Sequence, residues 1–147
     1  MAGKLKLILM NQKEITTLGA GLRRINQKIL SRDNQQGAIR VWYQGEELYN
    51  DLCVELQDQE IQWFQFTIRG KYLSWDKKSD CWHTGITNEL RTEDLTFYPA
   101  SKLIESEKHL DEYFIKLAYA ILNTRAGEPI FDNIILLFEQ INSVKLP

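Results

Sequence analysis

The sequence has no long apolar run and few cysteines, and each absence narrows the class of protein. No stretch approaches the roughly 18 apolar residues that a membrane-spanning helix needs. Cys53 and Cys81 are the only cysteines in 147 residues, and a chain of this length forms a core without disulfides. We therefore expect two reduced thiols, a cytoplasmic protein and no membrane span.

Recognisable patterns for cofactors and metals are also missing. The glycines within 17–24 match neither the dinucleotide-binding pattern G-x-G-x-x-G nor the phosphate-binding pattern G-x-x-x-x-G-K-[ST]. The two histidines, His83 and His109, and the two cysteines lack the paired spacing of zinc ligands. These patterns predict no cofactor, no metal and no enzyme.

Cys81 and His83 are the one pair that places a possible nucleophile beside a possible base. On a strand they share a face, with Cα atoms about 7 Å apart. Catalytic cysteines usually meet their histidine through the fold instead of two residues away, so we interpret the pair as strand residues without a chemical role. A small-ligand or enzyme pocket between a sheet and the C-terminal helices, with His83 inside it, is an alternative.

What the sequence does contain is typical of one α+β domain over 1–147. Hydrophobic residues make up 44% and charged residues 26%, as in ordinary globular proteins. All four tryptophans lie in the block 38–86, which also precedes the first proline, Pro99. Short alternating segments predict an antiparallel β-meander of four to six strands. The expected strands are Ala38–Gln44, Leu48–Gln57, Ile61–Ile68, Lys71–Trp75 and Cys81–Ile86.

The turns decide which side chains share a face. A two-residue turn at 69–70 sets Phe66 opposite Leu73 and Phe64 opposite Trp75. At 58–60, a two-residue turn would place Trp63 among the apolar residues of the preceding strand. A three-residue loop would place Phe64 and Phe66 there instead, and we favour it because Asp-Gln lacks glycine. One face is then Leu52, Val54, Leu56, Phe64, Phe66, Leu73 and Trp75, and the other is Cys53, Glu55, Trp63, Gln65, Thr67 and Tyr72.

The N-terminal segment 1–36 predicts a first strand over Met1–Met10 and a basic amphipathic helix over Glu14–Ser31. Apolar residues at Ile15, Leu18, Leu22, Ile25 and Ile29 form one stripe of this helix, and Arg24, Lys28 and Arg32 lie beside it. Gly19 and Gly21 suggest either that the helix begins nearer Ala20 or that close packing requires the missing side chains.

The C-terminal segment 107–142 predicts a helical hairpin packed on the sheet. Leu110, Phe114, Leu117 and Ile121 share one stripe of its first helix. Gly127 is a plausible stop, and Pro129 fits the first turn of the next helix. Apolar residues cover so much of that second helix that we expect it to be packed on more than one side.

Charge is divided unevenly along the chain. Residues 1–40 carry eight basic and two acidic side chains, a net charge of +6, while the whole chain has −2. The basic part either docks on the acidic remainder or stays available for an anionic partner.

These observations favour a non-catalytic protein-interaction or adaptor domain that binds an unknown protein or associates with itself as a homodimer. The alternative is single-stranded nucleic acid, bound by basic residues of the N-terminal helix and stacked on strand aromatics. The candidate binding residues are Arg24, Lys28, Arg32, Trp42, Trp63 and Tyr72. Nucleic acid is the less favoured partner because the rest of the chain is acidic.

Overall fold

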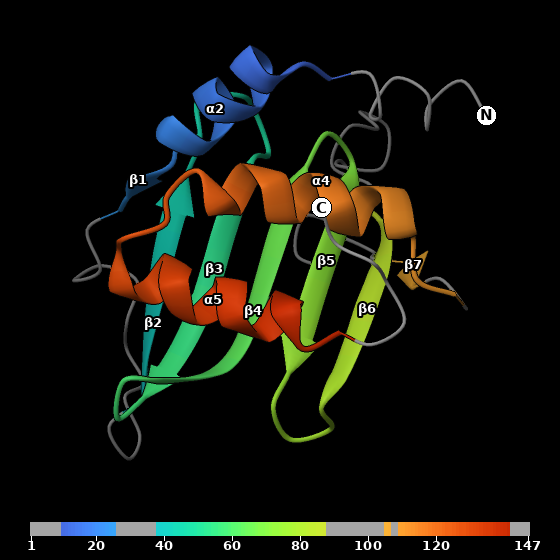
Figure 1. Cartoon of the computed structure of the whole chain (residues 1–147). Coiled ribbons are helices and arrows are strands. Elements are labelled where there is room, and N and C mark those ends of the chain that lie inside the picture. The colour runs from blue at the N-terminus through green and yellow to red at the C-terminus, as the bar shows by residue number, and fades with distance from the viewer. Residues whose placement is uncertain (1–9, 26–37, 88–104, 107–108, 142–147) are drawn as a thin grey trace, which may run out of the picture.

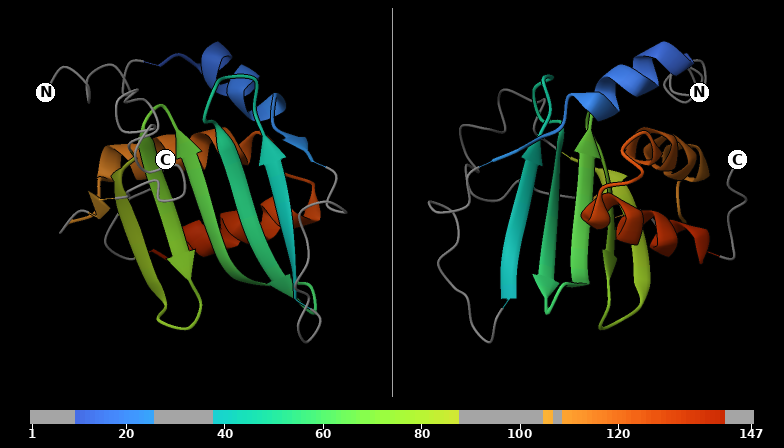
Figure 2. Two further views of the ribbon diagram at one scale, coloured as in Figure 1. Left: turned by 180° about the vertical axis from the view of Figure 1, so that it is seen from behind. Right: turned by 60° about the vertical axis from the view of Figure 1, so that its left-hand side comes forward.

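A seven-stranded antiparallel sheet carries two helices on one of its faces (Figures 1 and 2). The structure is a computed structural model that describes residues 10–25, 38–87, 105–106 and 109–141. The helices are α2 (Gln12–Ala20), α4 (Glu112–Asn123) and α5 (Pro129–Glu139). The strands are β1 (Arg23–Arg24), β2 (Ala38–Gln44), β3 (Asp51–Gln57), β4 (Glu60–Ile68), β5 (Lys71–Asp76), β6 (Cys81–Ile86) and β7 (Glu105–Ser106).

The predicted α+β meander is confirmed, together with an N-terminal helix and the C-terminal helical hairpin. Strand order in the sheet is the same as strand order in the chain, from β1 to β7. Helices α4 and α5 lie side by side on one face, and α2 lies at one end of the sheet near α4 (Figure 2). No described helix has the length and apolar content to cross a membrane.

The turn between β4 and β5 has the predicted register. Phe66 pairs with Leu73 and Phe64 with Trp75. Arg69 and Gly70 both have positive φ, at 53° and 82°, as a two-residue turn between right-twisted strands requires. Glycine at the second position accepts this conformation without steric cost.

The turn between β3 and β4 differs from the prediction, but the faces are those predicted. Gln57 pairs with Glu60 across a two-residue turn in which Asp58 and Gln59 both have positive φ. The register then shifts, so that Leu56 pairs with Ile61 but Glu55 pairs with Trp63.

Gln62 is therefore the extra residue of a β-bulge. The bulge returns Phe64 and Phe66 to the same face as Leu52 and Val54. The expectation of a three-residue loop was wrong because the additional residue lies inside the strand.

The core lies between the sheet and the hairpin. Rings from β4, β6 and α5 meet there, with centroids of Phe64 and Phe138 6.2 Å apart and those of Trp82 and Phe138 5.1 Å apart. Phe64 and Phe138 are fully buried. Each such side chain contributes roughly 1.5–3 kcal/mol through removal of apolar surface from water, which fixes the hairpin on this face.

A polar contact fixes the start of α4 on the sheet. Asp111 caps the helix by accepting a hydrogen bond from the backbone N–H of Phe114 at 3.1 Å. Its other carboxylate oxygen pairs with Lys71 at 2.6 Å, and its backbone N–H donates to Thr84 Oγ1 at 2.9 Å. The buried carboxylate is thus fully partnered, as a buried charge must be.

The N-terminal helix is shorter than predicted, because α2 ends at Ala20. Gly21 caps it, and Arg23–Arg24 then pairs with Tyr43 and Gln44 as β1. The proposed helical stripe from Ile15 to Ile29 is therefore wrong at Leu22 and Ile25, and Ile29 lies outside the described residues. Leu22 is buried in the core although it follows the helix. The predicted strand Met1–Met10 lies outside the described residues except for Met10, which is not in a strand.

Close packing explains one of the two glycines. A Cβ atom on Gly19 would overlap Thr124 Oγ1 and lie 2.6 Å from the carbonyl oxygen of Ile121 on α4. Gly19 therefore allows the end of α2 to touch the end of α4.

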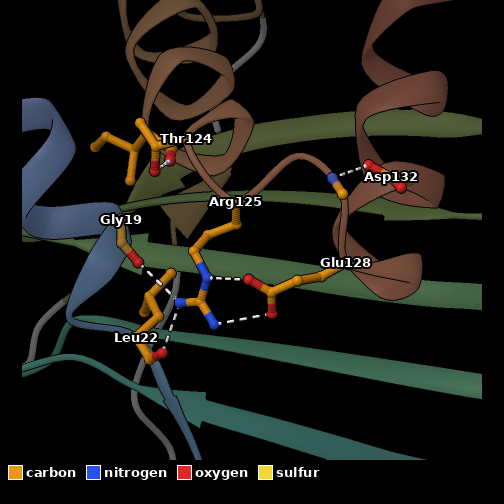
Figure 3. A network of polar contacts seen from close by, with 8 residues as sticks. Gly19, Leu22, Thr124, Arg125, Glu128 and Asp132 are labelled. Carbon is orange, nitrogen blue, oxygen red and sulfur yellow. Dashed lines mark hydrogen bonds and ion pairs between the residues drawn. The ribbon is translucent and has the colours of Figure 1, made fainter.

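Arg125 joins the same two segments (Figure 3). Its Nη1 donates to the carbonyl oxygens of Gly19 and Leu22 at 2.9 and 2.6 Å. Its Nε and Nη2 donate to the two carboxylate oxygens of Glu128, and its guanidinium lies 4.7 Å from the ring centroid of Phe131. The guanidinium makes these four hydrogen bonds at once, one more than the three donors of a lysine ammonium allow. The turn between α4 and α5 is thus anchored to the N-terminal segment.

Candidate binding surfaces on the two sides of the sheet

The structure brings three of the predicted binding residues onto the sheet face opposite the hairpin. Trp42 lies on β2, Trp63 on β4 and Tyr72 on β5. Their chain neighbours Val41, Phe64 and Leu73 are buried in the core beneath the helices. Because successive side chains of a strand alternate, the three aromatic residues point to the other side.

The basic residues of the prediction are not brought together with them. Arg24 is exposed on the edge strand β1 and is not part of a helix. Lys28 and Arg32 lie outside the described residues. The predicted basic helical stripe is therefore wrong at Arg24, because the helix has already ended at Ala20.

A concavity of about 540 Å³ surrounds Trp63 on this face. This Trp63 concavity is lined mainly by Arg40, Glu55, Gln57, Gln62, Trp63 and Asp76. The indole is half-buried, and the Arg40 guanidinium carbon lies over it, 5.6 Å from the ring centroid. That distance is within the range of a cation–π interaction, which holds the two side chains in one arrangement.

Register explains why these side chains meet. Arg40 pairs with Glu55, Glu55 with Trp63, and Trp63 with Asp76, so one row crosses four strands. Lys78 also lines the concavity. The described residues of the row and its margin thus include two cations and two carboxylates, and their charges balance.

Other residues of this face offer less surface. Tyr72 is only 5% exposed, so its ring provides little area for stacking. Cys53 is buried, and the loss of hydration raises the pKa of its thiol to about 11. A thiol with so high a pKa stays protonated at neutral pH and is a poor nucleophile.

A second concavity, of about 560 Å³, lies on the helix side, at the end of the sheet where α5 meets β4 and β5. We call it the α5 groove. Its apolar lining comes from Ile61, Trp75, Leu136 and Leu137. Leu136 is 55% exposed, while Ile61 and Trp75 are buried and belong to the core.

Polar groups form the margin of the α5 groove. The Trp75 indole N–H donates to the carboxylate of Asp80 at 3.2 Å. Lys77 pairs with Glu60 at 3.0 Å. Within the described ranges Asp80 has no ion pair, so it is the uncompensated negative charge of the margin.

The groove was not predicted from the sequence, although one signal for it was present. The apolar residues of α5 cover more of the helix than the sheet alone can bury. The predicted packing of α5 on more than one side is therefore only partly present. Ile134 and Phe138 are buried, but Leu136 is exposed and Leu137 half-buried. The surplus apolar positions mark the wall of the α5 groove.

His83 does not lie between the sheet and the hairpin. Its neighbours Trp82 and Thr84 contact Phe138 and Asp111, so His83 points to the opposite face, where it is exposed. The alternative that places His83 in a pocket between the sheet and the hairpin is therefore wrong. Cys81 is also exposed and donates its S–H to the backbone carbonyl of Ser79.

Metal-ligating side chains do not cluster in the part of the chain that the structure describes, where no three Asp, Glu, His or Cys residues come together. The chain matches no protein family, no curated protein and no solved structure.

Proposed function

We propose that this chain is a non-catalytic protein-interaction domain that binds an apolar side chain of its partner in the α5 groove. The observation that carries the proposal is the exposed Leu136 beside the buried ring of Trp75. Binding energy in protein interfaces is concentrated where an apolar anchor fills such a pocket and a polar margin excludes water.

The shape and rigidity of the groove support this use. Its volume lies within the roughly 300–1,000 Å³ of typical ligand pockets. Ile61 and Trp75 belong to the core, so they are already held in place before a partner arrives. A preformed surface loses less conformational entropy on binding and therefore retains more of the contact energy as affinity.

The charge of the margin indicates the partner's chemistry. Glu60 is neutralised by Lys77, whereas Asp80 has no ion pair among the described residues. A basic residue next to the apolar anchor would supply the missing opposite charge. The proposed partner segment is therefore a leucine-like residue flanked by lysine or arginine, carried by another protein or by a second copy of this chain. Two free thiols support a cytoplasmic setting for it.

A peptide titration followed by NMR tests the proposal. The probes are a short peptide with a central Lys-Leu-Lys and two matched peptides with Lys-Ala-Lys and Glu-Leu-Glu. We expect Lys-Leu-Lys to shift the indole N–H signal of Trp75, and the other two to shift it at least roughly tenfold more weakly at equal concentration. Equal shifts from all three peptides, or none from Lys-Leu-Lys, would contradict the proposal.

Two variants locate the site. Leu136→Ser should weaken the Lys-Leu-Lys titration, because it removes the exposed apolar wall without touching the core. Ile39→Thr is the matched control, since Ile39 is 46% exposed on β2 and does not line the groove. Sedimentation velocity of the same proteins distinguishes a second copy from another partner. If the chain associates with itself through the groove, the Leu136→Ser protein should have a smaller sedimentation coefficient than wild type, and otherwise the two should be equal.

A further inference from the structure

The Trp63 concavity has an aromatic platform whose direction is fixed by the backbone. The bulge at Gln62 turns Trp63 away from the core, since regular alternation from the buried Ile61 would have placed Trp63 on the helix side. Two hydrogen bonds hold the bulge: the backbone N–H of Lys77 donates to the Gln62 carbonyl at 2.9 Å, and Gln62 Nε2 donates to the Glu60 carbonyl at 3.2 Å. Bulges often aim a side chain at a functional site in this way.

The polar groups around the platform are of one geometrical kind. Arg40, Glu55, Gln57, Gln62 and Asp76 all end in planar groups with two or more adjacent nitrogen or oxygen atoms. Carboxylates accept two hydrogen bonds, guanidinium donates several, and amides do both. Such groups match neighbouring hydroxyls on a ring, where one hydroxyl donates and the next accepts, and the bonds to charged groups are the stronger ones.

Charge argues against the other ligands that an aromatic platform takes. Among the described lining residues, Arg40 and Lys78 balance Glu55 and Asp76, so this part of the chain supplies no excess of positive charge with which to hold a phosphate backbone. A cationic ligand would compete for the Trp63 ring with the Arg40 guanidinium, which already lies over it. A neutral ligand with many hydroxyls meets neither obstacle.

We propose that the Trp63 concavity binds a neutral glycan, with one sugar ring against the indole of Trp63 and its hydroxyls bonded to Glu55, Asp76 and the amide of Gln62. The C–H groups on one side of a pyranose ring form an apolar patch that suits an indole, and its equatorial hydroxyls face the planar groups around it. The site lies on the opposite side of the sheet from the α5 groove, so it is independent of the proposed protein contact.

The test uses ¹⁵N-labelled full-length protein and follows the four tryptophan indole N–H signals. The neutral probes are cello-, malto-, laminari- and xylo-hexaose and chitohexaose, each at millimolar concentration. The charged probes are hexagalacturonate and hexathymidylate. We expect at least one neutral hexaose to shift the Trp63 signal in a saturable way while the Trp75 signal stays in place, and we expect neither charged probe to do so.

Variants assign the contact to the concavity. Glu55→Gln keeps the shape of the side chain but removes a charged acceptor, and we expect roughly tenfold weaker binding of the active hexaose, the loss of about one hydrogen bond to a charged group. Asp76→Asn is the second such variant, in case the first does not fold. Trp42→Phe lies on the same face outside the concavity and should bind as wild type does.

Three results would overturn the proposal. They are no shift of Trp63 by any neutral hexaose, equal binding by the Glu55→Gln and Asp76→Asn proteins, or a salt-dependent shift by hexathymidylate alone. The last result would assign the platform to single-stranded nucleic acid. None of these results bears on the peptide titration at Trp75, so failure of one proposal leaves the other standing.

Discussion

The α5 groove and the Trp63 concavity have nearly the same volume, about 560 and about 540 Å³, but opposite linings. One has an apolar wall that continues into the core, and the other has charged and amide groups around a single indole. Strand β4 contributes to both, with Ile61 in the groove and Gln62 and Trp63 in the concavity. One extra residue in a strand can therefore divide consecutive side chains between two different surfaces.

The largest expected effect on stability comes from two adjacent residues whose side chains lie on opposite faces of the sheet. Phe64→Ala removes a fully buried ring under the hairpin, and we expect it to lower the free energy of unfolding by about 3–5 kcal/mol. Trp63→Ala removes a larger but half-buried ring from the opposite face and should cost less than half as much. Urea denaturation of both proteins measures the difference. Equal losses would mean that Trp63 is as much a core residue as Phe64.

Arg125→Met tests how much the stability of the helical hairpin depends on the hydrogen bonds of Arg125. The substitution leaves the carbonyl oxygens of Gly19 and Leu22 without this donor, and we expect a loss of about 1–3 kcal/mol. Arg125→Lys keeps the charge but not the fork and should recover only part of that loss. Hydrogen exchange should rise in α5 and stay unchanged in the central strand β4, and a uniform rise would contradict a local role.

Cys53 and Cys81 lie on the polar face of the sheet and differ in exposure. A thiol reagent should modify Cys81 in the native protein and Cys53 only after unfolding. Burial raises the pKa of Cys53 to about 11, so between about pH 9 and pH 11 the unfolded thiol loses its proton first. Stability should therefore fall as pH rises through this window, and Cys53→Ala should reduce that fall.

The smallest expected effect lies at the end of the sheet near α2. Arg69 forms two hydrogen bonds with Glu47, and these lower the pKa of the Glu47 carboxyl. Their contribution is present above the ordinary pKa of glutamate and is lost as pH falls through the lowered value. Because both side chains are well exposed, Glu47→Gln should cost less than about 1 kcal/mol at neutral pH, measured by thermal unfolding. A larger loss would place this ion pair among the structural contacts.

The meander and the hairpin could be predicted because their signals are local. Alternation and turn residues gave the strands, and the register of Phe66 with Leu73 followed from one turn. The end of α2 could not be predicted, since Leu22 keeps helical spacing with Leu18 and is buried like a helix residue although it follows the helix. Pairing of Arg23–Arg24 with β2 decided against the helix, and that pairing joins residues about 20 positions apart.

The candidate sites were only partly predictable. Trp63 was proposed as a binding residue, which stays a prediction, and only its sheet face is confirmed. The bulge that directs it has no sequence signal as clear as glycine in a turn. The α5 groove depends on how α5 meets the end of the sheet, and apolar periodicity reveals a surplus of apolar residues without showing where it is exposed. Neither Asp80 nor Gln62 stands out until the fold places it beside an indole.

The order of the strands has a consequence for biosynthesis. Each strand of the meander pairs with the one made just before it, so the ladder can close hairpin by hairpin as the chain leaves the ribosome. The helices that cover its apolar face follow the strands in the sequence, at 112–123 and 129–139. A nascent chain that has completed the ladder must therefore wait for those residues, and this interval is when the protein is most exposed to aggregation and to chaperone capture.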